Sequence, residues 1–183
     1  MDYFTADPHF GHANIIKYCK RPYDTVEEMD AKILAAWNER FKPGDRLFIL
    51  GDFCGQRRSA EVIRGYLDRI ALKRGAVMLI GGNHDNKQGC RKVFGDNYRH
   101  HEYYTYTHPG TKQKIVLCHY AMRVWNGSHR GVWHLYGHSH GNLEDDPFSY
   151  SFDCGVDGKI IWSFPEVVER MKTKSFRPVD HHK

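Results

Sequence analysis

Leu79-Ile80-Gly81-Gly82-Asn83-His84-Asp85 is an apolar run that stops at two glycines and is followed by an amide, an imidazole and a carboxylate. The short apolar segment 76–80 is closed by Gly-Gly, which is typical of a buried β-strand rather than of a helix of three or more turns. Open α/β sheets bind ligands beyond the carboxyl ends of their strands, so the polar triplet lies where chemistry is expected. A turn rich in Asn and Asp would show the same local pattern.

Four other apolar runs end in the same way, and this repetition favours a functional site over a simple turn. The polar segments that follow these runs are Asp7-Pro8-His9, Gly51-Asp52, His119 and Gly137-His138-Ser139-His140. Every run thus ends in a residue type that binds metal ions.

Length and composition are those of one globular domain. A chain of 183 residues can bury about 70% of its unfolded surface around one core, and we expect a single domain over residues 1–183. No run reaches the roughly 18 apolar residues of a membrane span. The first residues carry no basic and apolar leader, so the expected location is the cytoplasm.

Cysteine, charge and histidine usage narrow the class of protein. The five cysteines are scattered and never form a Cys-x-x-Cys pair, so neither a disulfide framework nor a thiolate zinc site is indicated. The net charge of +5 suits anionic partners, but the basic residues are dispersed, so nucleic-acid binding is allowed and not specifically indicated. Thirteen histidines favour a metal site.

Strands and helices alternate in the first half of the chain. Strands are expected at 2–6, 46–50 and 76–80. Helices are expected at 14–19, at 25–40 behind the capping box Thr25-Val26-Glu27-Glu28, and at 59–70 behind Ser59. This order predicts parallel strands joined by right-handed crossovers.

The second half is richer in strands and predicts a second sheet packed on the first. Residues 98–108 and 112–118 flank Pro109-Gly110-Thr111 and are expected to form a hairpin. Closing strands are expected at 152–156 and 159–162. A final helix should begin after Ser163, with Pro165 in its first turn and Glu166 placed to cap it. Residues 121–131 lack a period and are interpreted as a loop near the site.

Two divalent ions held close together need nitrogen and oxygen ligands and one carboxylate that bridges them. A histidine taken singly is more often a surface or core residue than a ligand. Jointly, seven ligand-type residues at strand ends, none in a predicted helix, indicate a metal centre: Asp7, His9, Asp52, Asn83, His119, His138 and His140.

These motifs, in this order, resemble the five motifs of the calcineurin-like metallophosphoesterase superfamily. The extended forms Asp7-Pro8-His9-Phe10-Gly11-His12 and His119-Tyr120-Ala121-Met122 resemble a small, single-domain bacterial or phage branch of predicted phosphoesterases. The resemblance implies an α/β (α+β) fold, a four-layer αββα sandwich of two mixed β-sheets flanked by helices. It also implies a dinuclear centre at one rim.

Matched residue by residue, the resemblance implies one ion on Asp7, His9, Asp52 and His140, and a second on Asp52, Asn83, His119 and His138. Asp52 would bridge them. His84 would face the phosphate as the general acid, with Asp85 holding its imidazole. The expected reaction is hydrolysis by a hydroxide shared between two ions, of which manganese is the first expectation and iron, zinc or nickel are alternatives.

The substrate is less closely defined by the sequence. Residues 51–56 lack the acidic and arginine residues of the protein Ser/Thr phosphatase branch, so a phosphodiester, a small nucleotide or another small phosphoester is expected. Candidate substrate contacts are His12, Arg123 and Arg130. Tyr120, Trp125 or Trp133 could stack a base, although at least one of them is expected in the core.

Two other functions stay open at this level. A nuclease acting on DNA or RNA would present a basic groove leading to the metals. A non-catalytic scaffold for another protein would keep the fold and lose catalysis, which the intact ligand set argues against.

Overall fold

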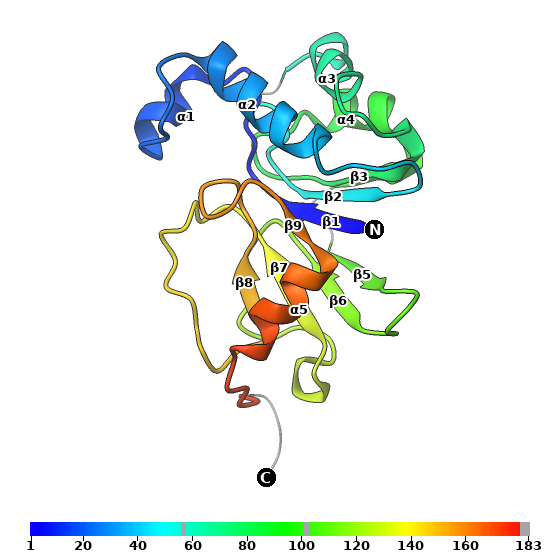
Figure 1. Ribbon diagram of the computed structural model, residues 1–183, viewed down its shortest axis with the longest axis vertical. Helices are drawn as coiled ribbons and strands as arrows, with labels where there is room; N and C mark the ends of the chain where they lie inside the picture. Colours follow the sequence, from blue (N-terminus) through cyan, green and yellow to red (C-terminus); the bar gives the residue numbers. More distant parts are fainter. Residues whose placement is uncertain (56–57, 101–102, 180–183) are drawn as a thin grey trace.

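The structure, a computed structural model, describes residues 1–55, 58–100 and 103–179. Its first sheet has the order β4-β3-β2-β1-β9 (Figure 1). The strands are β1 (Asp2–Thr5), β2 (Arg46–Leu50), β3 (Val77–Ile80), β4 (Tyr98–Arg99) and β9 (Trp162–Ser163). β1 to β4 pair in parallel, whereas β9 runs antiparallel to β1. The predicted parallel pairing of the first three strands is confirmed.

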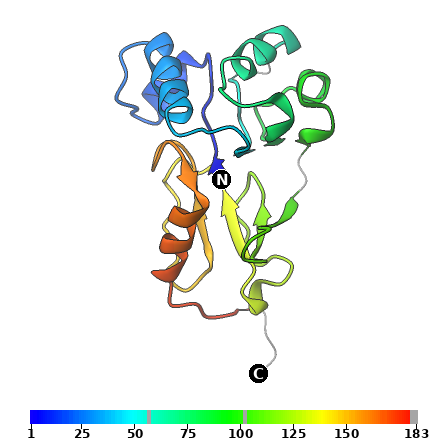
Figure 2. The same cartoon turned by 45° about the vertical axis from the view of Figure 1, so that its right-hand side comes forward.

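Four helices cover the side of this sheet that faces away from the second sheet (Figures 1 and 2). They are α1 (Ala13–Tyr18), α2 (Val26–Asn38), α3 (Ala60–Leu67) and α4 (Lys87–Phe94). Trp37 of α2 and Ile63 of α3 are buried in one apolar cluster with Leu79 of β3. This cluster fixes the helical layer on the sheet, because apolar burial is the main favourable term in folding.

Local capping explains where the helices begin. The Thr25 hydroxyl accepts the Glu28 N–H, and the Ser59 hydroxyl accepts the Val62 N–H, as the sequence predicted. The other half of the predicted capping box differs, because the Glu28 carboxylate accepts the Asp24 N–H rather than the Thr25 N–H. The second of these helices ends at Leu67 rather than at residue 70. α4 was not predicted, because it is short and strongly polar and buries only Gly89, Cys90 and Phe94. Two 3-10 turns, Arg74–Ala76 and Gly95–Asn97, lead into β3 and β4.

The second sheet has the order β5-β6-β7-β8. Its strands are β5 (Tyr104–Thr107), β6 (Lys114–Leu117), β7 (Trp133–Tyr136) and β8 (Ser151–Asp153). The predicted hairpin is confirmed as the antiparallel pair of β5 and β6. However, Tyr98 and Arg99 do not extend it. They pair with Leu79 and Ile80 and so belong to the first sheet, and residues 101–102 lie outside the described residues.

Apolar side chains of both sheets meet in a second cluster, which includes Phe48, Leu117 and Leu135. α5 (Phe164–Lys172) adds Val167 to it. Both halves of the predicted capping box are present, formed by Ser163 and Glu166. Both closing strands are shorter than predicted. β8 begins one residue before the predicted segment 152–156, and β9 lies at the end of the predicted segment 159–162. Helices α1 to α4 cover the outer face of the first sheet, and α5 packs against β9 and β1 at the cluster between the sheets. These two mixed β-sheets flanked by helices confirm the predicted α/β fold class.

The loop 121–131 packs against the second sheet around His134, in the first half of β7. Trp125 is buried with its ring 5.2 Å from that of His134, and the short turn Ser128–Arg130 follows it. Trp125 is therefore a core residue. Over the described ranges, no helix has the length and apolar character that crossing a bilayer requires.

Candidate metal centre

The predicted ligands follow the carboxyl ends of β1, β2, β3, β6 and β7, and the two sheets bring these ends to one rim. Seven described residues other than glycine have a positive φ, and the ones at this rim are Asp7, His9, Asp52, His138 and His140. Such a backbone conformation costs of order 1–3 kcal/mol per residue and persists at functional sites, where the surrounding structure imposes it. The chain thus accepts strain at the positions that present these side chains.

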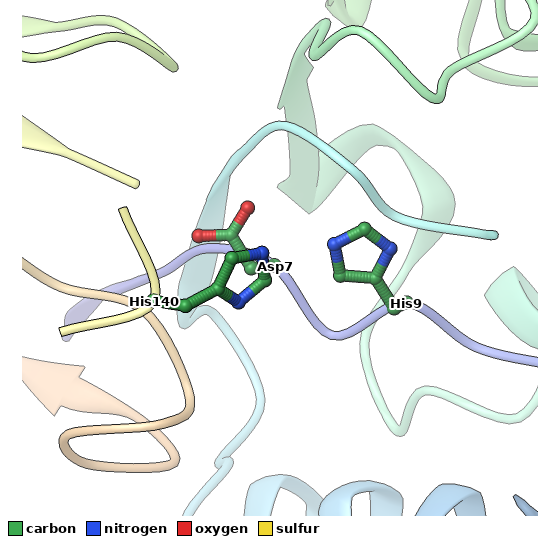
Figure 3. A group of neighbouring side chains, drawn as sticks. All are labelled: Asp7, His9 and His140. Carbon is green, nitrogen blue, oxygen red and sulfur yellow. The ribbon is translucent and has the colours of Figure 1, made fainter. Parts of the chain in front are cut away.

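Asp7, His9 and His140 form the first ligand group (Figure 3). Their ligand atoms lie within 4.8 Å of one another. Asp7 and His9 come from the loop after β1, and His140 comes from the loop after β7. The His138 N–H donates to Asp7 Oδ2 over 2.8 Å, which ties the two loops together.

Asp52, His119 and His138 form the second ligand group, again with ligand atoms within 4.8 Å of one another. Asn83 Oδ1 lies 3.0 Å from His119 Nε2, so the asparagine joins this group. Only glycine fits at position 51, next to this second ligand group. The φ of Gly51 is +90°, and a Cβ there would lie 2.2 Å from His119 Nδ1.

Asp52 lies between the two groups. Its Oδ2 atom is 3.5 Å from His9 Nε2 in the first group and 3.6 Å from His119 Nε2 in the second. All seven residues that the sequence singled out therefore meet at one place, with the carboxylate predicted to bridge in the middle.

The side-chain chemistry of these residues fits divalent cations. Asp7 Oδ1 and both ring nitrogens of His9 are buried and find no hydrogen-bond partner among the residues that the structure describes, whereas buried polar atoms are nearly always paired. Burial and the neighbouring Asp52 raise the pKa of Asp7, and burial lowers the pKa of His9. A bound cation would offset the repulsion between the carboxylates of Asp7 and Asp52, and it would bind the neutral imidazole of His9. Mixed nitrogen and oxygen ligands suit manganese, iron, zinc or nickel better than calcium.

Hydrogen bonds orient two of the imidazoles. His119 Nδ1 donates to the Leu50 carbonyl over 2.8 Å, and His140 Nδ1 donates to Asp157 Oδ2 over 2.7 Å. In each ring Nε2 keeps its lone pair, which is the arrangement of metal-binding histidines. Asp157 was not predicted as part of the site, although it directly follows the segment 152–156 that was expected to be a strand. Only the folded chain shows that this carboxylate lies beside His140.

Asp85 has a structural role that differs from the predicted one. Its carboxylate accepts the backbone N–H groups of Asp52, Phe53 and Gly82 over 2.8–3.0 Å. No hydrogen bond to the His84 ring occurs among the described residues. Asp85 therefore fixes the backbone that carries Asp52. Burial, and then the charge of Asp52, raise the pKa of Asp85 to about 7, although the three N–H groups oppose this shift.

His84 lies at the edge of the first ligand group. Its N–H donates to Asp52 Oδ1 over 2.9 Å, and its ring centre is 5.0 Å from that of His9 and 5.7 Å from that of His12. His12 is buried, and burial, followed by the charges of His84 and Arg58, lowers its pKa. Of the three predicted substrate contacts, His12 therefore lies beside the metal-ligand residues.

The other two predicted contacts lie elsewhere. Arg123 and Arg130 are exposed on the loop 121–131, and neither has a hydrogen bond or ion pair with a ligand residue in the described part of the chain. Arg130 Nε instead donates to His129 Nε2. Among the described residues, the arginines that approach the centre are Arg21, which donates to the Asp7 carbonyl over 2.7 Å, and Arg58, which donates to the Gly11 carbonyl over 2.6 Å.

The calcineurin-like phosphoesterase family matches residues 3–163, which cover both sheets and every ligand described above. The chain belongs to this family. It is therefore a hydrolase of phosphoric ester bonds, and the family is metal-dependent. The resemblance stated from the sequence is confirmed.

Three similar proteins share part of this sequence or its fold. An uncharacterized protein of Methanocaldococcus jannaschii is 35% identical over 147 residues, which are 80% of this chain and 73% of that protein. The gene 66 protein of Mycobacterium phage L5 is 34% identical over 83 residues, 45% of this chain and 39% of that protein. A solved structure of a protein of unknown function from Aquifex aeolicus shares the fold, with a TM-score of 0.69 and 22% identity over 93% of this chain and 98% of that one.

Proposed function

We propose that the protein is a dinuclear metal-dependent phosphoesterase that hydrolyses phosphodiesters or small nucleotides, with His84 as the general acid. The observation that carries this proposal is the position of Asp52, whose Oδ2 atom lies within 3.6 Å of an imidazole nitrogen of each ligand group. One carboxylate between two donor sets suits a pair of divalent ions, and manganese is the first candidate.

The metals and the protein side chains would contribute differently. Two bound ions would supply a water of lowered pKa and would take up charge on the phosphoryl oxygens. Asp7 and Asp52 hold the charge that attracts the ions, and the backbone bonds of Asp85 keep Asp52 in place. Positioning and electrostatics then account for most of the rate, as is usual in phosphoryl transfer.

His84 is supported as the acid by its surroundings. Its backbone is bound to Asp52, but its ring makes no hydrogen bond within the described ranges, so both nitrogens are available to a substrate. The ring stands edge-on to His9. An imidazole within hydrogen-bond reach of the leaving oxygen can protonate it near neutral pH.

The open surroundings of the centre favour a small substrate. Asn83 and His138 are exposed, and Tyr120 lies edge-on to His138 with ring centres 4.8 Å apart. An exposed tyrosine beside a ligand could stack a base or an aromatic leaving group. A cytoplasmic location also remains part of this proposal.

Three substrates, assayed with added manganese, test the proposed reaction. We expect bis-p-nitrophenyl phosphate to be cleaved faster than p-nitrophenyl phosphate, and chelation to abolish both activities. Faster cleavage of single-stranded DNA would favour a nuclease. Inactivity on all three by metal-loaded protein would refute the proposal and favour a scaffold.

The variant His84→Ala tests the assigned acid. For a phosphodiester with an alcohol as leaving group, turnover should fall by about 100-fold or more, the usual contribution of a positioned acid, while elemental analysis still finds both metals. The loss should be smaller for a substrate whose leaving group needs no proton. Loss of metal in this variant would remove His84 from the proposed role.

A further inference from the structure

Arg21 and Asp157 form a buried ion pair next to the first ligand group. Arg21 Nε lies 2.7 Å from Asp157 Oδ1, and Nη2 lies 2.9 Å from Oδ2. The exposed fractions of the two side chains are only 3% and 9%. Such a two-pronged contact fixes both side chains, because the planar guanidinium matches the carboxylate.

The same pair contacts both loops that supply the first ligand group. Arg21 Nη2 donates to the Asp7 carbonyl over 2.7 Å, and Nη1 donates to the Pro8 carbonyl over 3.0 Å. Asp157 Oδ2 accepts His140 Nδ1. Arg21 and Asp157 thus join the backbone between Asp7 and His9 to the ring of His140.

The local backbone is shaped to deliver Arg21 to this place. Lys20, directly before it, has a φ of +51°, a conformation that costs free energy for any residue with a side chain. The Arg21 N–H donates to Ile16 in α1, so the chain turns back sharply at the end of that helix. Asp157 lies in the segment between β8 and β9, where the Val156 N–H donates to the Ala6 carbonyl.

We propose that Arg21 and Asp157 are positioning residues that set the affinity of the ion held by Asp7, His9 and His140, and of that ion selectively. This inference rests on the proposed dinuclear centre. Asp157 acts by orienting His140 and keeping its proton on Nδ1. Arg21 acts by holding Asp157 and the Asp7 backbone.

Asp157 is better placed as an orienting residue than as a ligand. Cys19, His140 and Asp157 also have ligand atoms within 4.8 Å of one another. However, Oδ1 of Asp157 is bound by Arg21, and Oδ2 is bound by both Arg21 and His140. A cation there would lie against the guanidinium of Arg21, which repels it.

The test is manganese titration of the whole protein by calorimetry, with elemental analysis after removal of loosely bound ions. In Asp157→Asn, the affinity of one ion should fall by about 10–100-fold, the usual effect of removing an outer partner of a metal ligand. The other ion should keep its affinity. His140→Ala serves as reference and should weaken the same ion. Arg21→Lys, which keeps the charge but loses the fork, should give the same selective loss and replaces Asp157→Asn if that variant does not fold.

Asp2→Asn is the matched control. Arg46 contacts the Asp2 carboxylate with the same geometry, Nε to Oδ1 over 2.7 Å and Nη2 to Oδ2 over 2.9 Å, at the start of β1 and away from the ligands. The Asp2→Asn variant should leave the manganese affinities of both ions unchanged. Equal weakening of both ions in Asp157→Asn, no weakening, or the same loss in Asp2→Asn would overturn the positioning role. Wild-type protein that binds fewer than two ions would instead refute the dinuclear centre itself.

Discussion

Gly82→Ala should disable the centre by adding one methyl group. The Cβ of residue 82 would lie 2.2 Å from Asp52 Oδ1 and 2.7 Å from the Asp52 backbone nitrogen. Gly82 itself has no positive φ that alanine would strain. The substitution therefore tests the close approach of Gly82 to Asp52 and little else.

The required displacement can be worked out from these distances. Side-chain Cβ atoms essentially never approach another heavy atom within 3.0 Å, so Asp52 Oδ1 has to move by about 0.8 Å. The nearby backbone nitrogen cannot yield as a flexible side chain could. A misplacement of about 1 Å in a catalytic group costs on the order of 100-fold in rate, or about 2.7 kcal/mol of transition-state stabilisation. Overpacking should lower the free energy of unfolding by about 1–3 kcal/mol.

The assay is kcat/KM for bis-p-nitrophenyl phosphate at saturating manganese, with metal content and urea unfolding measured on the same samples. Gly65→Ala in α3 is the control, because no atom of the described residues would lie within 4 Å of the added Cβ. It should leave activity unchanged and stabilise the helix by about 0.5–1 kcal/mol. A Gly82→Ala protein that keeps both ions and more than a tenth of wild-type kcat/KM would refute the reasoning.

Three further outcomes are expected. Asp85→Asn replaces an acceptor of three backbone N–H groups and should lower the free energy of unfolding in urea by about 2–4 kcal/mol; a change below about 0.5 kcal/mol would contradict the anchoring role. Although burial opposes it, hydrogen bonds from two basic side chains and Ser163 lower the pKa of Glu166 to about 2. Because the unfolded pKa is about 4.3, this stabilisation is present above pH 4.3 and is lost as the pH falls toward 2. The melting-temperature gap between wild type and Glu166→Gln should therefore close over that interval, and a constant gap would exclude the charge effect. Manganese at about 100 times its Kd should add about 2.7 kcal/mol and raise Tm by about 5–10 °C, reversibly with chelator, whereas an equal effect of calcium would contradict the nitrogen-rich site.

The strands and the ligand positions could be read from the sequence because their signals are local. Each run such as 47–50 is apolar over a strand's length and ends in a ligand type such as Asp52. Parallel strands place their carboxyl ends at one edge, so the convergence of the ligands within each sheet followed from strand order. The meeting of the two edges depended on how the two sheets pack. Capping residues such as Thr25 and Ser59 located helix starts for the same local reason.

Other features were outside the reach of local patterns. α4 has few apolar residues, and its stability depends on packing of Cys90 and Phe94 against the rest of the core. The short strand at Tyr98 belongs to the first sheet because it pairs with Leu79 and Ile80. Its composition alone would also suit a strand of the hairpin. The interpretation of residues 1–183 as a single domain stays a prediction.

The sequence by itself determined which residues can bind metal and that they follow successive strands. Only the tertiary structure decided which groups orient them: that Asp85 binds backbone N–H groups rather than the His84 ring, that Arg21 pairs with Asp157, and that Arg123 lies apart. The physical reason is distance along the chain. Arg21 and Asp157 are separated by 136 positions, and whether a charged side chain is solvated or buried against a partner depends on what the folded chain brings beside it.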